Sequence, residues 1–270
     1  MPIGVFDSGF GGLTVLKEIV KELPQYDFIY LGDNARAPYG SRSFETVYEY
    51  TLECVKELLS KGCHLVILAC NTASAKALRT IQQKDLPVLA PNKRVLGVIR
   101  PTAEIVGALS KTKHVGILGT TGTVSSGSYK TEILNFFSDI HVFQEACPMW
   151  VPLIENGEFE SEAASMFIEK NVKALMQQSN KIDTIILGCT HYPLIEKQIK
   201  KFIPEQVRLL SQGEIVAKSL KNYLFRHPEI DEVCSKNATI TFYTTDLPES
   251  FDAQATRFYG KAIKSEHLNL

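Results

Sequence analysis

Two stretches of the chain share one pattern: LVILACNTAS at Leu65–Ser74 and TIILGCTHYPL at Thr184–Leu194. In each, a short apolar run leads into a cysteine, a polar pair and a helical pattern. Each is preceded by another apolar run that ends in a glycine-rich turn, GVFDSGFGG at Gly4–Gly12 and VGILGTTGT at Val115–Thr123. The cysteine follows the glycine turn by about 60 to 70 residues in both halves, within the usual error of element boundaries. This repetition predicts two similar α/β units in one chain.

Short apolar runs alternate with helical patterns along the rest of the sequence. Strands are expected at Ile3–Phe6, Phe28–Leu31, Leu65–Ala69, Val95–Ile99, Val115–Leu118, His141–Phe143, Thr184–Leu187, Val207–Leu210 and Thr239–Tyr243. Helices are expected at Leu13–Leu23, Phe44–Lys61, Ala73–Gln83, Glu160–Gln178, Pro193–Phe202 and Glu214–Phe225. The alternation indicates β-α-β units, and therefore an α/β fold with mainly parallel sheets flanked by helices.

The repeat also predicts two domains, and the length of chain left after the second half suggests that this last part returns to the first domain. We expect a first α/β domain of residues 1–97 plus 211–270 and a second of residues 98–210, with the join near Gly97–Pro101. Ligands of open parallel sheets bind outside the carboxyl ends of the strands. The two pseudo-symmetric domains should therefore face each other across a cleft that holds the active site.

Composition excludes several classes of protein. The 270 residues are 44% hydrophobic and 22% charged, as in an ordinary globular protein. With 29 Lys and Arg against 30 Asp and Glu, the chain has no excess positive charge to attract nucleic acid or an anionic membrane. The longest apolar run, Leu65–Cys70, is far shorter than the ~20 residues that span a bilayer. Met1–Phe6 lacks the features of a signal peptide. We expect a soluble, cytoplasmic protein with no membrane or nucleic-acid partner.

The six cysteines form neither a C-x-x-C pair nor a zinc-ligand set, so free thiols are expected. A single buried cysteine usually packs as a small hydrophobic residue. Cys70 and Cys189 differ from the others because each follows a strand and precedes a helix in the repeated pattern. A helix N-terminus lowers the pKa of a nearby thiol and offers N–H groups to an anion. Duplication of this arrangement favours a functional role for both.

Two opposed thiols suit one kind of chemistry better than others. Disulfide exchange usually uses closely spaced cysteines, and acyl transfer needs only one. Inversion of a stereocentre needs a base on one face of a carbon and an acid on the other. A racemase therefore fits the symmetry best.

Three other features have both a functional and a structural interpretation. Asp7 could order a thiol proton or receive a substrate ammonium, yet Asp7 or Ser8 could simply cap the next helix. His191 could move a proton near neutral pH, or merely be satisfied at a helix start. The loop at residues 32–40 is either a substrate loop or a surface connection. The turn Gly9–Thr14 resembles a dinucleotide fingerprint but lacks its last glycine or alanine, and Asp7 would repel a pyrophosphate.

These motifs resemble the cofactor-independent glutamate racemases along nearly the whole chain. The matching segments are FDSGFGGLTVL at Phe6–Leu16, LGDNARAPYG at Leu31–Gly40, ACNTAS at Ala69–Ser74, ACPMWVPLIENGE at Ala146–Glu158, GCTHYPL at Gly188–Leu194 and FYTT at Phe242–Thr245. The resemblance implies two pseudo-symmetric α/β domains with no metal, no pyridoxal phosphate and no other cofactor. It also implies a homodimer that supplies D-glutamate for bacterial peptidoglycan.

The resemblance further implies roles for individual residues. Cys70 and Cys189 would be the two acid/base residues, assisted by Asp7 and His191. Substrate contacts would come from Asp7, Ser8, Tyr39, Gly40, Asn71, Thr72, Thr190 and His191, with Thr120 and Thr123 as further candidates. Thr102 stands where the family pattern suggests glycine and Ser211 where it suggests aspartate. We expect both departures to lie away from the motif residues and to affect only local loop shape.

Three alternatives remain open from the sequence. The first is a racemase of the same superfamily acting on aspartate or another small acidic substrate. A decarboxylase or hydrolase with one active cysteine would tolerate loss of the other. An amino-acid-binding module would bind glutamate and leave its configuration unchanged.

Overall fold

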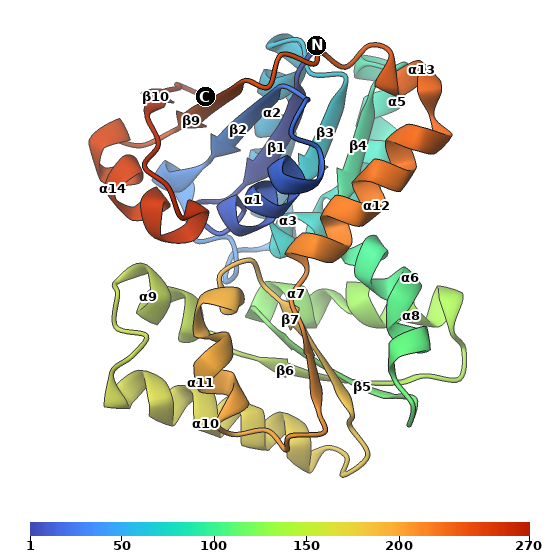
Figure 1. Ribbon diagram of the computed structural model, residues 1–270, viewed down its shortest axis with the longest axis vertical. Helices are drawn as coiled ribbons and strands as arrows, with labels where there is room; N and C mark the ends of the chain where they lie inside the picture. The colour runs from blue at the N-terminus through green and yellow to red at the C-terminus, as the bar shows by residue number, and fades with distance from the viewer.

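The computed structural model describes residues 1–270 and contains two parallel β-sheets, each covered by helices (Figure 1). The first sheet has the strand order β10-β9-β2-β1-β3-β4. Its strands are β1 (Ile3–Asp7), β2 (Phe28–Gly32), β3 (Leu65–Leu68), β4 (Arg94–Gly97), β9 (Ile240–Thr244) and β10 (Ser265–His267). All its strand pairs are parallel. This confirms the predicted α/β class.

The second sheet repeats the centre of the first. It has the order β6-β5-β7-β8 and is also parallel throughout. Its strands are β5 (His114–Gly119), β6 (His141–Ala146), β7 (Thr184–Gly188) and β8 (Arg208–Leu210). The order β2-β1-β3-β4 in one sheet corresponds to β6-β5-β7-β8 in the other. In both sheets the strand with the glycine-rich turn therefore lies beside the strand that precedes a repeat cysteine.

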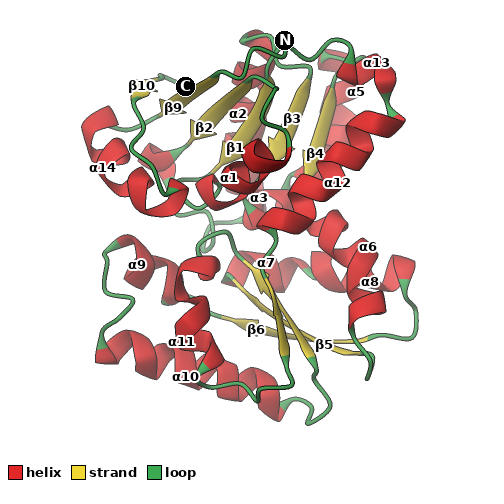
Figure 2. Cartoon of the chain, viewed as in Figure 1, coloured by secondary structure: helices red, strands yellow, loops and turns green.

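Helices cover both faces of each sheet (Figure 2). The principal helices are α1 (Leu13–Glu22), α2 (Phe44–Ser60), α3 (Asn71–Lys76), α6 (Ile99–Leu109), α7 (Thr121–Ser126), α8 (Ser128–Phe136), α9 (Trp150–Glu155), α10 (Glu162–Gln177), α12 (Gly213–Arg226) and α14 (Pro248–Tyr259). Shorter helices are α4 (Leu78–Thr80), α5 (Leu86–Leu89), α11 (Glu196–Lys200) and α13 (Pro228–Asp231). No helix is both long and apolar enough to cross a bilayer.

The central strands β1, β2 and β3 of the first sheet are buried on both faces, which explains why they read as continuous apolar runs. In β1, Ile3 and Val5 pack in the cluster that contains α1 and α12, whereas Phe6 packs in the cluster that contains α2. Alternate residues of a strand point to opposite faces of the sheet, so one apolar run serves two cores.

The chain crosses between the sheets twice. It leaves the first sheet after β4 and returns after β8, where α12 packs against α1 and its Lys221 Nζ lies 2.8 Å from Glu22 Oε1. Strands β9 and β10 then extend the first sheet beside β2. The two chain ends consequently lie on the same side of the molecule (Figure 1).

Most predicted elements are found within a few residues, but several details of the prediction were wrong. Val98 and Ile99 do not continue β4, because Val98 caps α6 and Ile99 begins it. The helix expected at Ala73–Gln83 is divided into α3, α4 and a π-helical turn at Ile81–Asp85. β10 was missed because its three residues, Ser-Glu-His, carry no apolar signal.

Candidate active site

One cavity of about 130 Å³ lies between the two sheets, outside the carboxyl ends of their strands. Every predicted catalytic or substrate-contacting residue lines it except Asp7: Ser8, Tyr39, Gly40, Cys70, Asn71, Thr72, Cys189, Thr190 and His191. Thr120 lines it as well, whereas Thr123 is fully buried behind it. The volume lies below the roughly 300–1,000 Å³ of drug-sized sites, so the cavity suits a small molecule.

Cys70 follows β3 and caps the short helix α3. Its Sγ accepts a hydrogen bond from the Ala73 N–H at 3.4 Å and donates one to Ser8 Oγ at 3.5 Å. Burial, reinforced by the carboxyl group of Asp7, raises the pKa of Cys70 to about 12. The Ala73 amide at the start of α3 does lower this pKa, as expected of a helix N-terminus, but burial outweighs that contribution.

Cys189 follows β7 and has different neighbours. Its Sγ lies 3.8 Å from Nδ1 of His191, whose Nε2 lies 2.9 Å from Glu155 Oε1. Burial alone would lower the pKa of His191, but its hydrogen bonds to Cys189 and Glu155 raise that pKa to about 10. The imidazole is thus positively charged at neutral pH. The expected α-helix after Cys189 is instead a 3₁₀ turn, η3 (Tyr192–Ile195), followed by α11.

Asp7 ends β1 and is 1% exposed, so it stands behind the cavity wall. Its Oδ1 accepts from the Gly9 N–H at 2.9 Å, and its Oδ2 accepts from the Thr190 hydroxyl at 3.4 Å. Burial raises the pKa of Asp7, although the charge of His191 and nearby backbone amides oppose the shift. The residue that caps α1 is Gly12, without a side-chain hydrogen bond, so neither Asp7 nor Ser8 caps that helix.

The glycine-rich turn after β1 allows close approach of neighbouring side chains. A β-carbon at Gly11 would overlap Thr190 Oγ1 and the His191 ring, and one at Gly12 would lie 2.5 Å from Asp7 Cβ. Gly11 therefore makes room for Thr190 and His191 from the second sheet, whereas Gly12 makes room for Asp7 of the preceding strand β1. This close packing accounts for a turn that otherwise resembles a dinucleotide motif.

A cluster of threonine hydroxyls closes another side of the cleft. Thr72 Oγ1 lies 2.9 Å from Thr120 Oγ1 and 3.4 Å from Thr123 Oγ1. The Gly122 N–H also donates to the Gly40 carbonyl at 2.7 Å. These contacts join segments that adjoin different sheets, so residues of both halves meet around the cavity.

The loop at residues 32–40 is held by a buried carboxylate. Asp33 accepts hydrogen bonds from Arg36 Nε at 2.7 Å, from Thr245 Oγ1 at 2.8 Å and from the Tyr39 hydroxyl. The Tyr39 hydroxyl is thus already occupied, which leaves its ring and backbone, together with Gly40, to line the cavity. Hydrogen bonds to Asp33 therefore fix the conformation of this loop, which forms part of the site.

Glu155 is the main residue of the site that the sequence analysis did not single out. It lies in α9 four residues after Val151, and both line the cavity because residues i and i+4 share a helix face. The signal was present in the segment ACPMWVPLIENGE. Cys147, the second residue of that segment, also lines the cavity and was likewise given no role.

The two departures from the family pattern have different surroundings. Ser211 Oγ lies 3.0 Å from Glu196 Oε2, a local loop contact as expected. Thr102, by contrast, is fully buried, and its Oγ1 lies 3.3 Å from Nε2 of Gln212, which also bonds Asn71. Thr102 therefore reaches the motif residue Asn71 through one intervening side chain, because the chain crossing places Gln212 between them.

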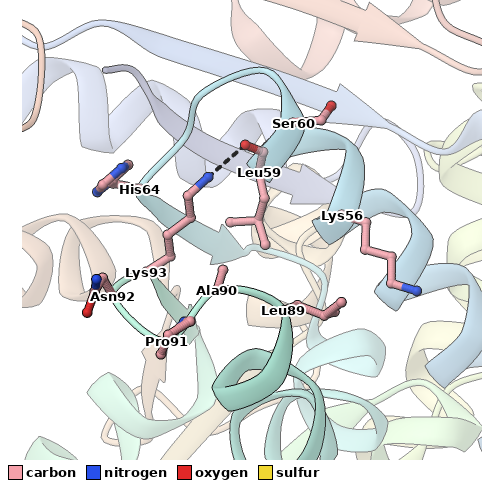
Figure 3. Close-up of a pocket in the computed structure, with 9 residues that line it drawn as sticks. All are labelled: Lys56, Leu59, Ser60, His64, Leu89, Ala90, Pro91, Asn92 and Lys93. Atoms are coloured by element: carbon pink, nitrogen blue, oxygen red, sulfur yellow. Dashed lines mark hydrogen bonds between the residues drawn. The ribbon is translucent and has the colours of Figure 1, made fainter.

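A different cavity, of about 500 Å³, lies at the opposite end of the first sheet (Figure 3). It adjoins the segments that precede β3 and β4 and contains His64, Lys56 and Lys93. The Lys93 ammonium donates to the Leu59 carbonyl at 2.8 Å. Neither of the repeat cysteines nor any motif residue lines this cavity.

No group of three or more His, Cys, Asp or Glu side chains in the structure is arranged to hold a metal ion.

Comparison with known proteins agrees with this geometry. A family model described as Asp/Glu/Hydantoin racemase matches residues 3–220. The chain belongs to this racemase family. It is 40% identical over 259 residues to a glutamate racemase of Geobacter metallireducens, covering 96% of this chain and 92% of that protein.

Solved structures in the racemase family share the fold. A glutamate racemase isoform from Bacillus anthracis superposes with a TM-score of 0.90 at 35% identity, over 100% of this chain and 97% of the other. The Francisella tularensis glutamate racemase, solved with D-glutamate, gives a TM-score of 0.87 at 32% identity, over 99% and 97% of the two chains.

Proposed function

We propose that this member of the racemase family interconverts L- and D-glutamate by moving a proton between two cysteines. The observation that carries the proposal is that Cys70 and Cys189 follow equivalent strands of two facing sheets and line one small cavity. The relatives named as glutamate racemases, one of them solved with D-glutamate, support glutamate as the substrate.

The two thiols have different neighbours. The His191 imidazole lies beside Cys189 and, when charged, would stabilise the negative charge on that sulfur while Cys189 acts as the base. Cys70, with its raised pKa, holds its proton at neutral pH. In one direction the Cys189 thiolate takes the α-proton of glutamate, and the C–H electron pair remains on the α-carbon. The Cys70 thiol then gives its proton to the opposite face, and the thiols exchange roles for the other enantiomer.

The α-hydrogen of an amino acid is a very weak acid, so the site must stabilise the carbanion. Neutral donors placed where charge develops contribute most in a cavity closed to water. We infer that Ser8, Thr72 and Thr190 supply such donors to the substrate carboxylates, helped by Asn71, Gly40 and Tyr39 through backbone groups. Asp7 and His191 would assist proton transfer at Cys70 and Cys189 respectively, and Glu155 would orient His191. Thr120 and Thr123 would brace Thr72.

The remaining expectations form part of the same proposal. Chemistry by side chains alone would make the enzyme independent of metals and pyridoxal phosphate. We infer that residues 1–97 plus 211–270 and residues 98–210 are separate domains, since the strands of each group share a sheet. Six free cysteines favour a reducing cytoplasm. A homodimer that supplies D-glutamate for peptidoglycan is proposed on the family resemblance and is tested by sedimentation and by complementation of a D-glutamate auxotroph.

The direct test uses purified, metal-stripped protein without added pyridoxal phosphate. It is incubated with L-glutamate in deuterated water while optical rotation and α-deuterium are followed together. Loss of rotation with deuterium incorporation is the expected result. Unchanged glutamate combined with racemisation of aspartate would assign the protein to the sister activity. No turnover of either substrate by folded protein would leave the cysteines as structural residues.

A further inference from the structure

Three buried polar side chains form a closed ring of hydrogen bonds just behind the cavity. The Tyr129 hydroxyl donates to Asn71 Oδ1, Asn71 Nδ2 donates to Gln212 Oε1, and Gln212 Nε2 donates to the Tyr129 oxygen, each at 2.7 Å. All three residues are at most 3% exposed. A buried network is rigid when each of its polar groups has a hydrogen-bond partner. Removing one side chain leaves its partners buried without a hydrogen bond.

The ring joins three separate parts of the fold. Asn71 begins α3 beside the first sheet, Tyr129 lies in α8 beside the second, and Gln212 stands where the chain returns between the sheets. Gln212 Nε2 also lies 3.0 Å from the carbonyl oxygen of Val98, at the outgoing crossing. Both crossings of the chain are therefore tied to one side chain, in the region where α6 and α12 meet between the sheets (Figure 1).

The ring also reaches both cysteines through the backbone. Asn71 directly follows Cys70. Tyr129 packs on Gly188, the residue before Cys189, so closely that a β-carbon at Gly188 would lie 3.2 Å from its Cε2. A shift of Tyr129 relative to Asn71 would thus change the separation of the two thiols.

We propose that Gln212, Tyr129 and the Asn71 side chain act as a positioning network that fixes the separation of the Cys70 and Cys189 thiols. This inference rests on the proposed two-thiol reaction. A misplacement of about 1 Å can cost about a hundredfold in rate, so the network matters for turnover more than for affinity. The Asn71 side chain serves this network, which leaves its backbone to contact substrate.

The test compares Gln212→Met, Tyr129→Phe and the double variant. Tyr129→Phe removes one oxygen atom and is the mildest change. Tyr26→Phe is the matched control, since it removes another tyrosine hydroxyl, bonded to Asp231 on the far side of the first domain. We expect each single variant to lower kcat about ten- to a hundredfold with a smaller change in KM. The double variant should be little worse than the worse single, because both break one ring. The control should keep wild-type kcat.

Amide hydrogen exchange without substrate tests the network independently of catalysis. Faster exchange confined to the crossings at residues 98–102 and 211–216 is expected in both single variants and absent in Tyr26→Phe. Three results would each overturn the proposal. They are wild-type kcat in the single variants, effects on kcat that multiply in the double variant, and faster exchange spread evenly through the core. If the wild type does not racemise glutamate, the proposed function is wrong. Hydrogen exchange at residues 98–102 and 211–216 still shows whether the network stabilises the two chain crossings.

Discussion

Cys70 and Cys189 occupy equivalent places in the two sheets, yet their neighbours differ. Counted onward from the pairs Phe6–Leu68 and Gly119–Gly188, Ser8 stands opposite Cys70 and Thr120 stands opposite Cys189. Both thiols are 6% exposed. The backbone repeat thus places a thiol opposite a hydroxyl in both sheets.

The groups outside the repeat make the two thiols chemically different. Cys70 has a hydroxyl and a buried carboxyl group nearby, and burial raises its pKa to about 12. Cys189 has an imidazole that is itself held by a carboxylate 36 residues earlier in the chain. In the proposed mechanism, the symmetry of the fold would supply the two faces of attack, while the different neighbours would prepare one acid and one base.

The largest expected effect comes from removing either thiol. Cys70→Ser and Cys189→Ser should each lower racemisation by about 10²–10⁴-fold, because each removes a general acid or base. Cys234→Ser, at a buried cysteine in no part of the cleft, is the control and should keep wild-type activity. Circular dichroism checks folding. Near-normal activity in either Cys70→Ser or Cys189→Ser would remove the two-thiol mechanism.

A sharper test asks whether the two halves act on opposite faces. His191→Asn should lower kcat about ten- to a hundredfold and increase the α-deuterium isotope effect mainly for one enantiomer, since it impairs proton transfer at Cys189. Asp7→Asn should increase it mainly for the other enantiomer. The isotope effects are measured on L- and D-glutamate separately. Equal increases for both enantiomers in both variants would contradict the division of roles.

The pH dependence tests the link between Glu155 and His191. Glu155 contributes to the raised pKa of His191, so Glu155→Gln lowers that pKa from about 10. The alkaline limb of kcat/KM should then move to lower pH by about one unit. Glu158→Gln, an exposed position three residues further on, is the control and should leave the limb in place.

The same pair predicts a pH-dependent stability difference. The folded-state pKa of His191 lies above its ordinary value near 6.5, so its charge stabilises the fold fully below about pH 6.5. That contribution disappears as pH rises through about 10. The Tm gap between the wild type and Glu155→Gln should therefore be wider at acidic than at strongly alkaline pH. A gap that widens with pH would contradict the assigned charge.

The smallest expected effect is the difference in stability between variants of the two equivalent hydroxyl residues, Thr120 and Ser8. Thr120 caps α7 through the Thr123 N–H at 3.3 Å and bonds Thr72, whereas Ser8 only accepts from Cys70. Thr120→Val should cost about 1 kcal/mol of stability, or about 2–4 °C in Tm. Ser8→Ala should leave Tm nearly unchanged and act on turnover instead. Calorimetry of the two variants distinguishes them, and equal losses of Tm would contradict this difference.

Local pattern predicts the repeat and most of the strands, and the carboxyl-edge rule places Cys70 and Cys189 at one cleft. The other cavity residues were predicted from the family resemblance, and Glu155 and Cys147 were missed. The raised pKa of Cys70 could not be predicted, since it follows from how much water the folded chain excludes. The pairing of Glu155 with His191 and of Thr102 with Gln212 joins residues distant in sequence. Similarly, β10 forms because β9 offers an edge, and its three polar residues carry no strand pattern of their own.

The return of the chain to its first sheet has a consequence for synthesis on the ribosome. All four strands of the second sheet, between His114 and Leu210, are made before β9 and β10 exist. At about 5–20 residues per second, the final 60 or so residues emerge over roughly 3–12 s. The later-encoded half can therefore finish folding first. The earlier half keeps an open edge at β2 until β9 is made, although every residue that lines the cavity has been synthesised by His191.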